Sequence, residues 1–285
     1  MNVREGQSDF TIGRKSFTAV AINTASKAGE WIKTKIGAYS ELKTKKNGRD
    51  LVTEVDKGTE TLIRKLIHTH FPDHQILGEE GIEPGEDALE KALKAAMEAE
   101  YVWIVDPIDG TTNFVHGFPV FAVSIALAHK GEIIVGVIYD PNRDEMFVAE
   151  KGKGAYVRGR RMYVSDENEL GQSLLATGFV PDPAAAEYNM RGFQTILPQA
   201  RSVRCAGSAA IHMAYVAAGR LSGFWESGLK VWDVAAGVLL VQEAGGKVTD
   251  LRGNPYTLET KDILATNGKI HEQISSELVR ANAVR

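Results

Sequence analysis

Short strands joined by very short turns fill residues 121–157 and constrain the fold more than any other stretch. Apolar runs follow one another at 121–129, 132–139, 145–150 and 155–157, and turn residues such as Gly131, Pro141 and Gly152 separate them. Connections this short join neighbouring antiparallel strands, because a parallel pair needs a long crossover. The stretch therefore predicts an antiparallel meander.

From about Leu174 the pattern changes to an alternation of strands and helices. Short apolar runs predict strands at 174–177, 221–225, 247–249 and 263–266. Segments with helical periodicity lie between them at 184–196, 209–218 and 231–244, and a last one runs from Lys269 to the end of the chain. Such alternation is typical of an α/β layer. Before the meander we expect helices at 10–36, 57–70 and 87–99, and a short strand at 75–81.

No internal repeat, low-complexity segment or Pro/Ser-rich linker divides the chain. We therefore expect one domain over residues 1–285 of α/β class, with an N-terminal half of about 1–165 and a C-terminal half of about 166–285.

Composition excludes several classes of protein. The chain is 285 residues long, 44% hydrophobic and 25% charged, with a net charge of −4, so neither disorder nor the basic surface of a nucleic-acid-binding protein is expected. The single cysteine, Cys205, excludes an intrachain disulfide and a thiolate zinc site. Because we find no apolar signal-peptide core and no apolar run long enough to span a membrane, we expect a cytoplasmic soluble protein.

The most informative single stretch covers residues 102–114. An apolar strand is expected to end at Pro107, which has no N–H to donate, with Asp106 and Asp109 at its end. Gly110 then allows a tight turn, and Thr111 begins a sequence suited to opening a helix. Two carboxylates suit a hard cation such as Mg²⁺, and free N–H groups suit a phosphate oxygen. Taken alone, the same residues are equally consistent with a structural turn.

Three further acids stand at the ends of expected elements. Glu79 follows a short strand, and if the strand continued, at most one of Glu79 and Glu80 would face a shared site. Asp233 begins a helix, as does Asp56, whose ordinary role would be that of an N-cap. Each acid alone is most often a cap or a loop residue. Together with the central stretch they mark the element ends at which α/β proteins build sites.

Three motifs resemble the metal-site signatures of the inositol monophosphatase family, which belongs to the lithium-sensitive, Mg²⁺-dependent sugar-phosphatase superfamily. They are Gly78-Glu79-Glu80, Asp106-Pro107-Ile108-Asp109-Gly110-Thr111-Thr112-Asn113-Phe114 and Trp232-Asp233-Val234-Ala235-Ala236-Gly237. Residues 50–56 and 204–210 match the family as well. The resemblance spans roughly residues 10–270 and implies a layered αβαβα fold, with an antiparallel N-terminal sheet and a mixed C-terminal layer.

The resemblance also implies two or three Mg²⁺ ions per site. The ligand positions that match this chain are Glu79, Asp106, the carbonyl of Ile108, Asp109 and Asp233, with Thr111 beside the first ion. Glu79, Asp106 and Thr111 would act in catalysis, Thr111 with Glu79 orienting a water that attacks phosphorus. Gly110 and Thr111 would hold the phosphate through their N–H groups. The remaining substrate-contact positions implied are Asp109, Ser208, Ala209, Glu226 and Asp233.

Asp56 would support this site or help to bind its metals. One lysine among Lys43, Lys45 and Lys46 would lie in a loop that closes over the metals in relatives. Cys205 and His116 lie near the motifs, but simple packing or surface exposure explains both.

The implied activity is that of an inositol-1-monophosphatase, a hydrolase of phosphoric monoesters that acts on a small sugar or polyol phosphate. Fructose-1,6-bisphosphatase, 3′(2′),5′-bisphosphate nucleotidase and NADP(H) phosphatase are alternatives with the same chemistry. A regulatory protein is an alternative of another class, since some bacterial relatives are thought to contact transcription or RNA machinery. The family also implies sensitivity to lithium and a homodimer without membrane partners.

Overall fold

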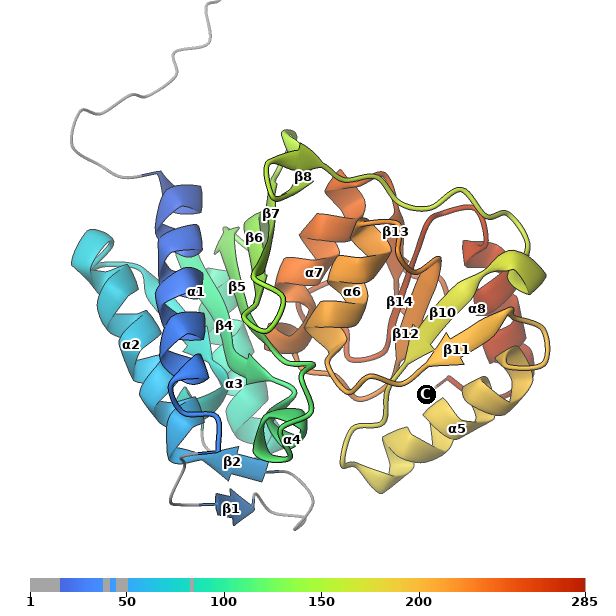
Figure 1. Ribbon diagram of the computed structural model, residues 1–285, viewed down its shortest axis with the longest axis horizontal. Helices are drawn as coiled ribbons and strands as arrows, with labels where there is room; N and C mark the ends of the chain where they lie inside the picture. The colour runs from blue at the N-terminus through green and yellow to red at the C-terminus, as the bar shows by residue number, and fades with distance from the viewer. Residues whose placement is uncertain (1–15, 38–41, 45–50, 83–84, 285) are drawn as a thin grey trace, which may run out of the picture.

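Two large sheets organise the protein (Figure 1), and the computed structural model describes residues 16–37, 42–44, 51–82 and 85–284. The helices are α1 (Phe17–Lys33), α2 (Glu54–His70), α3 (Glu86–Glu98), α4 (Thr111–Val115), α5 (Pro183–Ile196), α6 (Ala209–Ala217), α7 (Val231–Glu243) and α8 (His271–Arg280), with short 3₁₀ turns η1 (Glu79–Gly81) and η2 (Leu170–Gln172).

The first large sheet has seven strands in the order β3-β4-β5-β6-β7-β8-β9. These strands are β3 (Gln75–Gly78), β4 (Tyr101–Asp109), β5 (Ala122–His129), β6 (Glu132–Asp140), β7 (Glu145–Glu150), β8 (Gly154–Val157) and β9 (Arg160–Arg161). β3 and β4 are parallel, and every later pair is antiparallel. The predicted meander is confirmed.

The second sheet has five strands in the order β11-β10-β12-β14-β13. They are β10 (Leu174–Thr177), β11 (Ser202–Arg204), β12 (Gly223–Glu226), β13 (Lys247–Thr249) and β14 (Ile263–Thr266). β10 pairs in parallel with β11 and β12, whereas β14 is antiparallel to its neighbours. This is the mixed layer that we predicted. A separate two-stranded antiparallel sheet, formed by β1 (Leu42–Thr44) and β2 (Leu51–Thr53), precedes the first large sheet in the sequence.

Three apolar cores separate five layers, which confirms the αβαβα prediction. The first core packs α1 and α2 against one face of the seven-stranded sheet, around side chains such as Ile63 and Trp103. The central and largest core fills the space on both sides of α6 and α7, between the two sheets. The third core packs α5 and α8 on the outer face of the second sheet (Figure 1). The central strands are buried because both faces of each sheet are covered.

Several local expectations about the backbone were wrong. β4 does not end at Pro107 but continues to Asp109, because the pairing with β5 shifts between Asp106 and Asp109 and this irregularity accommodates the proline. α2 begins at Glu54 rather than Lys57. Its N-cap is Thr53, and Asp56 is the third helical residue, whose carboxylate accepts from the Thr53 N–H at 2.8 Å.

The first helix begins at Phe17 instead of residue 10, after an N-cap serine; residues 10–15 of that prediction lie outside the described part. Glu79 and Glu80 stand in η1 rather than in a continuing strand. The predicted lysine loop is described only at Lys43, whereas Lys45 and Lys46 lie outside the described residues. In the part of the chain that the structure describes, no helix has the length and apolarity needed to cross a membrane.

Candidate active site

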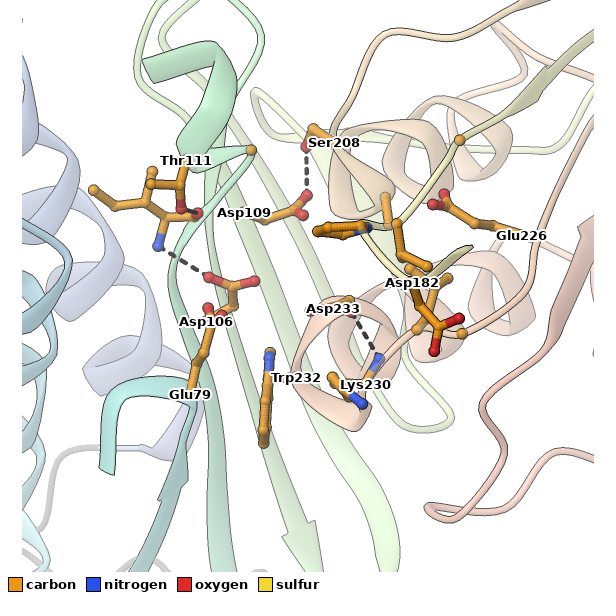
Figure 2. A pocket seen from close by; sticks show the side chains of 18 of the residues that line it. Glu79, Asp106, Asp109, Thr111, Asp182, Ser208, Glu226, Lys230, Trp232 and Asp233 are labelled. Carbon is orange, nitrogen blue, oxygen red and sulfur yellow. Dashed lines mark hydrogen bonds between the residues drawn. The ribbon is translucent and has the colours of Figure 1, made fainter. Parts of the chain in front are cut away.

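The parallel pair β3 and β4 brings the first two acids together. Gly78 is in register with Val105, so the chain presents Glu79 and Asp106 side by side immediately after these paired positions. Figure 2 shows the two carboxylates pointing toward one another. The Ile108 N–H donates to Asp106 Oδ1 at 3.0 Å, which fixes one carboxylate oxygen within the irregular end of β4.

All the predicted site residues line one open cavity of about 680 Å³. These are Glu79, Asp106, Ile108, Asp109, Gly110, Thr111, Ser208, Ala209, Glu226 and Asp233. The cavity lies between the two sheets, and its walls come from both halves of the chain. Glu80 lines it as well, because the 3₁₀ turn does not alternate its side chains as a strand does. The expectation that at most one of the two glutamates reaches the site was therefore wrong.

Asp109 connects the end of β4 to the start of α6. Its Oδ2 accepts a hydrogen bond from the Ser208 hydroxyl and another from the Ala210 N–H at 2.8 Å. Ser208 is also the N-cap of α6, as predicted, and accepts from the Ile211 N–H at 3.2 Å. One carboxylate thus ties together residues that lie about a hundred positions apart in the sequence.

The Asp56 carboxylate accepts a hydrogen bond from the Thr111 side chain but does not itself line the cavity. The Thr111 hydroxyl lies 2.9 Å from Asp56 Oδ1 and 3.1 Å from the Ile108 carbonyl oxygen. A hydroxyl has one proton to donate and keeps lone pairs that can accept from a third group. The Thr111 oxygen can therefore still accept a hydrogen bond from a molecule in the cavity.

Gly110 allows the chain to turn sharply between β4 and α4. Its φ of 96° lies in the left-handed region, and an added Cβ would meet the Gly207 carbonyl oxygen at 3.1 Å. The next turn is anchored by Asn113, whose Nδ2 donates at 2.7 Å to the carbonyl oxygens of both Val120 and Ala206. The start of α4 is therefore fixed against the loop that precedes α6.

Burial and mutual repulsion dominate the electrostatics of the site. Burial raises the pKa of Asp106 well above its ordinary value, and the charges of Glu79, Asp109 and Asp233 raise it further. Burial also raises the pKa of Asp109 to about 6, against the opposing effect of its hydrogen bond from Ser208. A cation placed among these carboxylates would relieve the repulsion.

Two acids from the second half complete this pattern. Asp233 accepts from the Lys230 N–H at 2.7 Å at the start of α7, and burial with the charges of Asp109 and Glu79 raises its pKa. Glu226 ends β12 and is 5% exposed. Burial raises its pKa well above the ordinary value, with a contribution from the charges of Asp233 and Asp109.

The donor set fits a hard divalent cation. The acids that line the cavity offer oxygen atoms only, which Mg²⁺ and Ca²⁺ prefer. Within the described residues no three acidic, histidine or cysteine side chains already converge closely enough to enclose a metal. Glu79, Asp106, Asp109 and Asp233 nevertheless face one cavity, and the charges of Glu79 and Asp109 raise the pKa values of both Asp106 and Asp233. They are the residues that would hold the cation.

Sequence reasoning missed several residues that form the outer wall of the cavity. They are Lys57, Phe179, Val180, Pro181, Asp182, Lys230 and Lys261. Lys230 could have been found from its place three residues before Asp233, and Asp182 from its position before Pro183 at a helix start. No comparable signal marks Lys261, which reaches the cavity from the loop before β14. Neither Cys205, which is exposed, nor His116 lines the cavity.

A family model described as the inositol monophosphatase family matches residues 14–283. The chain belongs to this family. It is 43% identical over 257 residues to "Nus factor SuhB" of Pseudomonas aeruginosa, covering 88% of this chain and 91% of that protein. It is 39% identical over 265 residues to "Inositol-1-monophosphatase" of a Synechocystis species, covering 93% and 89%.

The fold agrees with solved members of the family. The inositol monophosphatase structure from Anabaena (Nostoc) superposes with a TM-score of 0.80 at 40% identity, covering 93% of this chain and 95% of that one. Inositol monophosphatase family members are generally metal-dependent and act on small phosphorylated substrates. The family match thus supports a phosphatase, in accord with an acid-lined cavity built at the ends of strands.

Proposed function

We propose that this chain is an Mg²⁺-dependent phosphomonoester hydrolase that converts myo-inositol monophosphate to inositol and phosphate. The observation that carries the proposal is that Glu79, Asp106, Asp109 and Asp233, from three separate places in the sequence, face one cavity. When bound there, Mg²⁺ would lower the pKa of a water, neutralise the leaving oxygen and screen the phosphate charge.

The chain's own residues would prepare the water and the phosphate. The Thr111 hydroxyl, held by Asp56 at 2.9 Å, would accept a hydrogen bond from the attacking water and so orient it toward phosphorus, with Glu79 nearby. The N–H groups of Gly110 and Thr111, at the turn into α4, would donate to phosphate oxygens. No protein residue needs to become phosphorylated in this scheme.

Substrate positioning would come from the second half of the chain. Asp109, oriented by Ser208 and Ala210, and Glu226 on β12 would accept hydrogen bonds from the hydroxyl groups of the polyol. Asp233 and the backbone at Ala209 would complete the contacts on that side. These roles rest on the family resemblance and on the common cavity. Lithium inhibition and a homodimer, which the family also implies, are part of the proposal.

Phosphate release in the presence of Mg²⁺ tests the proposal directly. The panel consists of inositol 1-phosphate, fructose 1,6-bisphosphate, 3′-phosphoadenosine 5′-phosphate and NADP⁺. We expect the highest kcat/KM for inositol 1-phosphate. A preference for another member of the panel would move the substrate assignment to that bisphosphatase, nucleotidase or NADP phosphatase and leave the chemistry in place.

A second candidate function is favoured by the printed name of one relative. The protein of Pseudomonas aeruginosa that is 43% identical to this chain is named a Nus factor. A comparable role here would be binding of transcription or RNA machinery, although the net charge of −4 does not favour direct contact with RNA. Mg²⁺ binding without phosphate release from any panel member, together with RNA binding that Asp106→Asn leaves unchanged, would favour this second function.

A further inference from the structure

An ion pair between a buried glutamate and a half-buried arginine lies directly behind the turn that carries Glu79. Glu60 on α2 is 3% exposed, and its Oε1 accepts from Arg64 Nε at 2.8 Å, one helical turn away. Its Oε2 accepts from the Glu80 N–H at 2.7 Å. Arg64 Nη1 reaches the Ile76 carbonyl oxygen at 3.3 Å on β3. The pair therefore forms hydrogen bonds with the backbone on both sides of Glu79, at Ile76 and at Glu80.

Two glycines allow this close approach. A Cβ added at Gly78 would meet the Glu60 Cδ at 2.5 Å, and one added at Gly81 would meet Arg64 Nη2 at 2.4 Å. Both contacts are closer than real Cβ atoms approach a neighbour. The backbone from residue 78 to residue 81 thus lies flat against the Glu60–Arg64 pair, with Glu79 in its middle.

The Glu79 segment has little intrinsic means of holding its own geometry. η1 is three residues long, and its N-cap, Gly78, offers no side-chain cap. Isolated turns of this length are only marginally stable. Hydrogen bonds to the backbone of the turn therefore contribute to the direction in which Glu79 projects toward Asp106.

We propose that the Glu60–Arg64 pair is a positioning element that fixes Glu79 for metal binding. This inference rests on the proposed metal-dependent function, and it assigns no contact between the pair and substrate or metal. Neither Glu60 nor Arg64 lines the large cavity. Residues that orient metal ligands from behind typically change metal affinity or activity about 10- to 100-fold when they are mutated.

The matched test compares two Glu–Arg pairs in which the glutamate is buried and the arginine is half-buried. Glu60→Gln keeps the volume of the side chain but removes the charge that Arg64 needs. Glu145→Gln does the same to the pair of Glu145 with Arg220, which lie 2.6 Å apart at the far end of α6 and outside the cavity. The readouts are the Kd of Mg²⁺ and of Mn²⁺ by titration calorimetry, and the melting temperature of the metal-free proteins.

We expect Glu60→Gln to weaken the affinity for both ions by about 10- to 100-fold, whereas Glu145→Gln leaves it within a factor of about two. Excess Mg²⁺ should restore the kcat of Glu60→Gln. Both variants should show similar losses in melting temperature, since both remove the charge of a buried glutamate that pairs with a half-buried arginine. Unchanged metal affinity in Glu60→Gln, or an equal loss in Glu145→Gln, would overturn the proposal.

Arg64→Ala offers a second test by chemical rescue. Arg64 lines a small cavity of about 210 Å³ between β3 and α3, which gives a free guanidinium ion a path to the vacated position. Millimolar guanidinium should restore part of the lost Mn²⁺ affinity in Arg64→Ala and none in Glu60→Gln. Equal behaviour of the two variants would count against the positioning role.

The metal titration separates this inference from the proposed function. A wild-type protein that binds Mn²⁺ yet releases phosphate from no substrate would refute the hydrolase proposal, and the comparison of variants would still decide the role of Glu60. A wild-type protein that binds neither Mg²⁺ nor Mn²⁺ would overturn both.

Discussion

The Thr111 hydroxyl and the Asp56 carboxylate lie 2.9 Å apart, although 55 positions separate them in the sequence. Asp56 is 2% exposed, and its second oxygen accepts from both the N–H and the hydroxyl of Thr53. It is therefore part of the capping of α2 and at the same time holds Thr111 at the cavity. The Asp56 side chain thus links the start of α2 to the proposed position of the attacking water.

This coupling predicts non-additive effects on catalysis. Thr111→Val should lower kcat by about 10²- to 10⁴-fold, the range expected for a positioned proton-transfer group, with a smaller change in KM. Asp56→Asn should have a related effect, because the amide can present a donor where the hydroxyl needs an acceptor. The double variant should be little worse than Thr111→Val alone when all four proteins are assayed at saturating Mg²⁺. Additive losses would show that the two residues act separately.

Asp106→Asn should abolish turnover and stabilise the metal-free protein. The carboxylate is buried among Glu79, Asp109 and Asp233, whose charges and the burial itself raise its pKa. A neutral amide removes this repulsion, so we expect the free energy of unfolding without metal to rise. Metal affinity and kcat should fall by more than about 100-fold. Urea unfolding measures the free energy of unfolding, and titration calorimetry measures the metal affinity. Near-normal turnover would refute the assignment of Asp106 as a metal ligand.

The motifs predicted which residues share a cavity, but they did not predict the local backbone correctly. The residues predicted to bind metal or substrate or to act in catalysis all line one cavity, whereas Asp56 lies behind Thr111 and does not line it. Each motif places its functional side chains at a fixed position in a turn or at a strand end. Pro107 was misread because proline ends most ladders, and only the antiparallel partner β5 reveals the shift that accommodates it. Local propensity carries no information about such a partner.

Glu60 shows a second limit of prediction from sequence. A Glu followed four positions later by an Arg on an amphipathic helix is typical of a solvent-exposed pair. Here Glu60 is buried, since β3 and the two glycines Gly78 and Gly81 close over it. The burial of Glu60 depends on how α2 packs against β3, and the hydrophobic periodicity of either element alone does not predict that packing. Lys261 was missed for a similar reason.

Stabilisation by Mg²⁺ should increase with pH. A carboxyl group whose folded-state pKa is raised stabilises the fold below its unfolded value, and this contribution is lost as pH rises through the folded value, about 6 for Asp109. Mg²⁺ competes with these protons, so its effect grows as they leave. At free Mg²⁺ of 100 times its Kd we expect about 2.7 kcal/mol of added stability at pH 8.

At pH 5 the same concentration of Mg²⁺ should add far less stability. Thermal unfolding with and without Mg²⁺ at each pH measures the difference, and choline chloride at equal ionic strength controls for screening. Taking the difference at each pH cancels groups that do not contact the metal. An equal shift at pH 5 and pH 8 would mean that these acids do not bind the cation.

His212 should make stability fall at acid pH. Burial lowers its pKa from 6.5 to about 4. Its Nε2 accepts from the Ala206 N–H at 3.2 Å, and its buried Nδ1 has no partner among the described residues. A proton therefore binds the unfolded chain more readily than the folded one. The contribution of neutral His212 is complete above pH 6.5 and is lost as the pH falls toward 4, by about 1.4 kcal/mol per unit.

His212→Gln isolates this effect, because the amide oxygen can still accept from the Ala206 N–H while the side chain no longer titrates. We expect the variant to be less stable than the wild type at pH 7.5, since it loses ring packing against Phe224 at a centroid distance of 5.1 Å. The gap should narrow steadily below pH 6.5 and reach its minimum near pH 4. Urea unfolding of both proteins across this range gives the two curves, and His271, which burial also holds at a pKa of about 4, contributes equally to each. Curves that stay parallel would show that His212 takes up its proton in the folded protein as easily as in the unfolded chain.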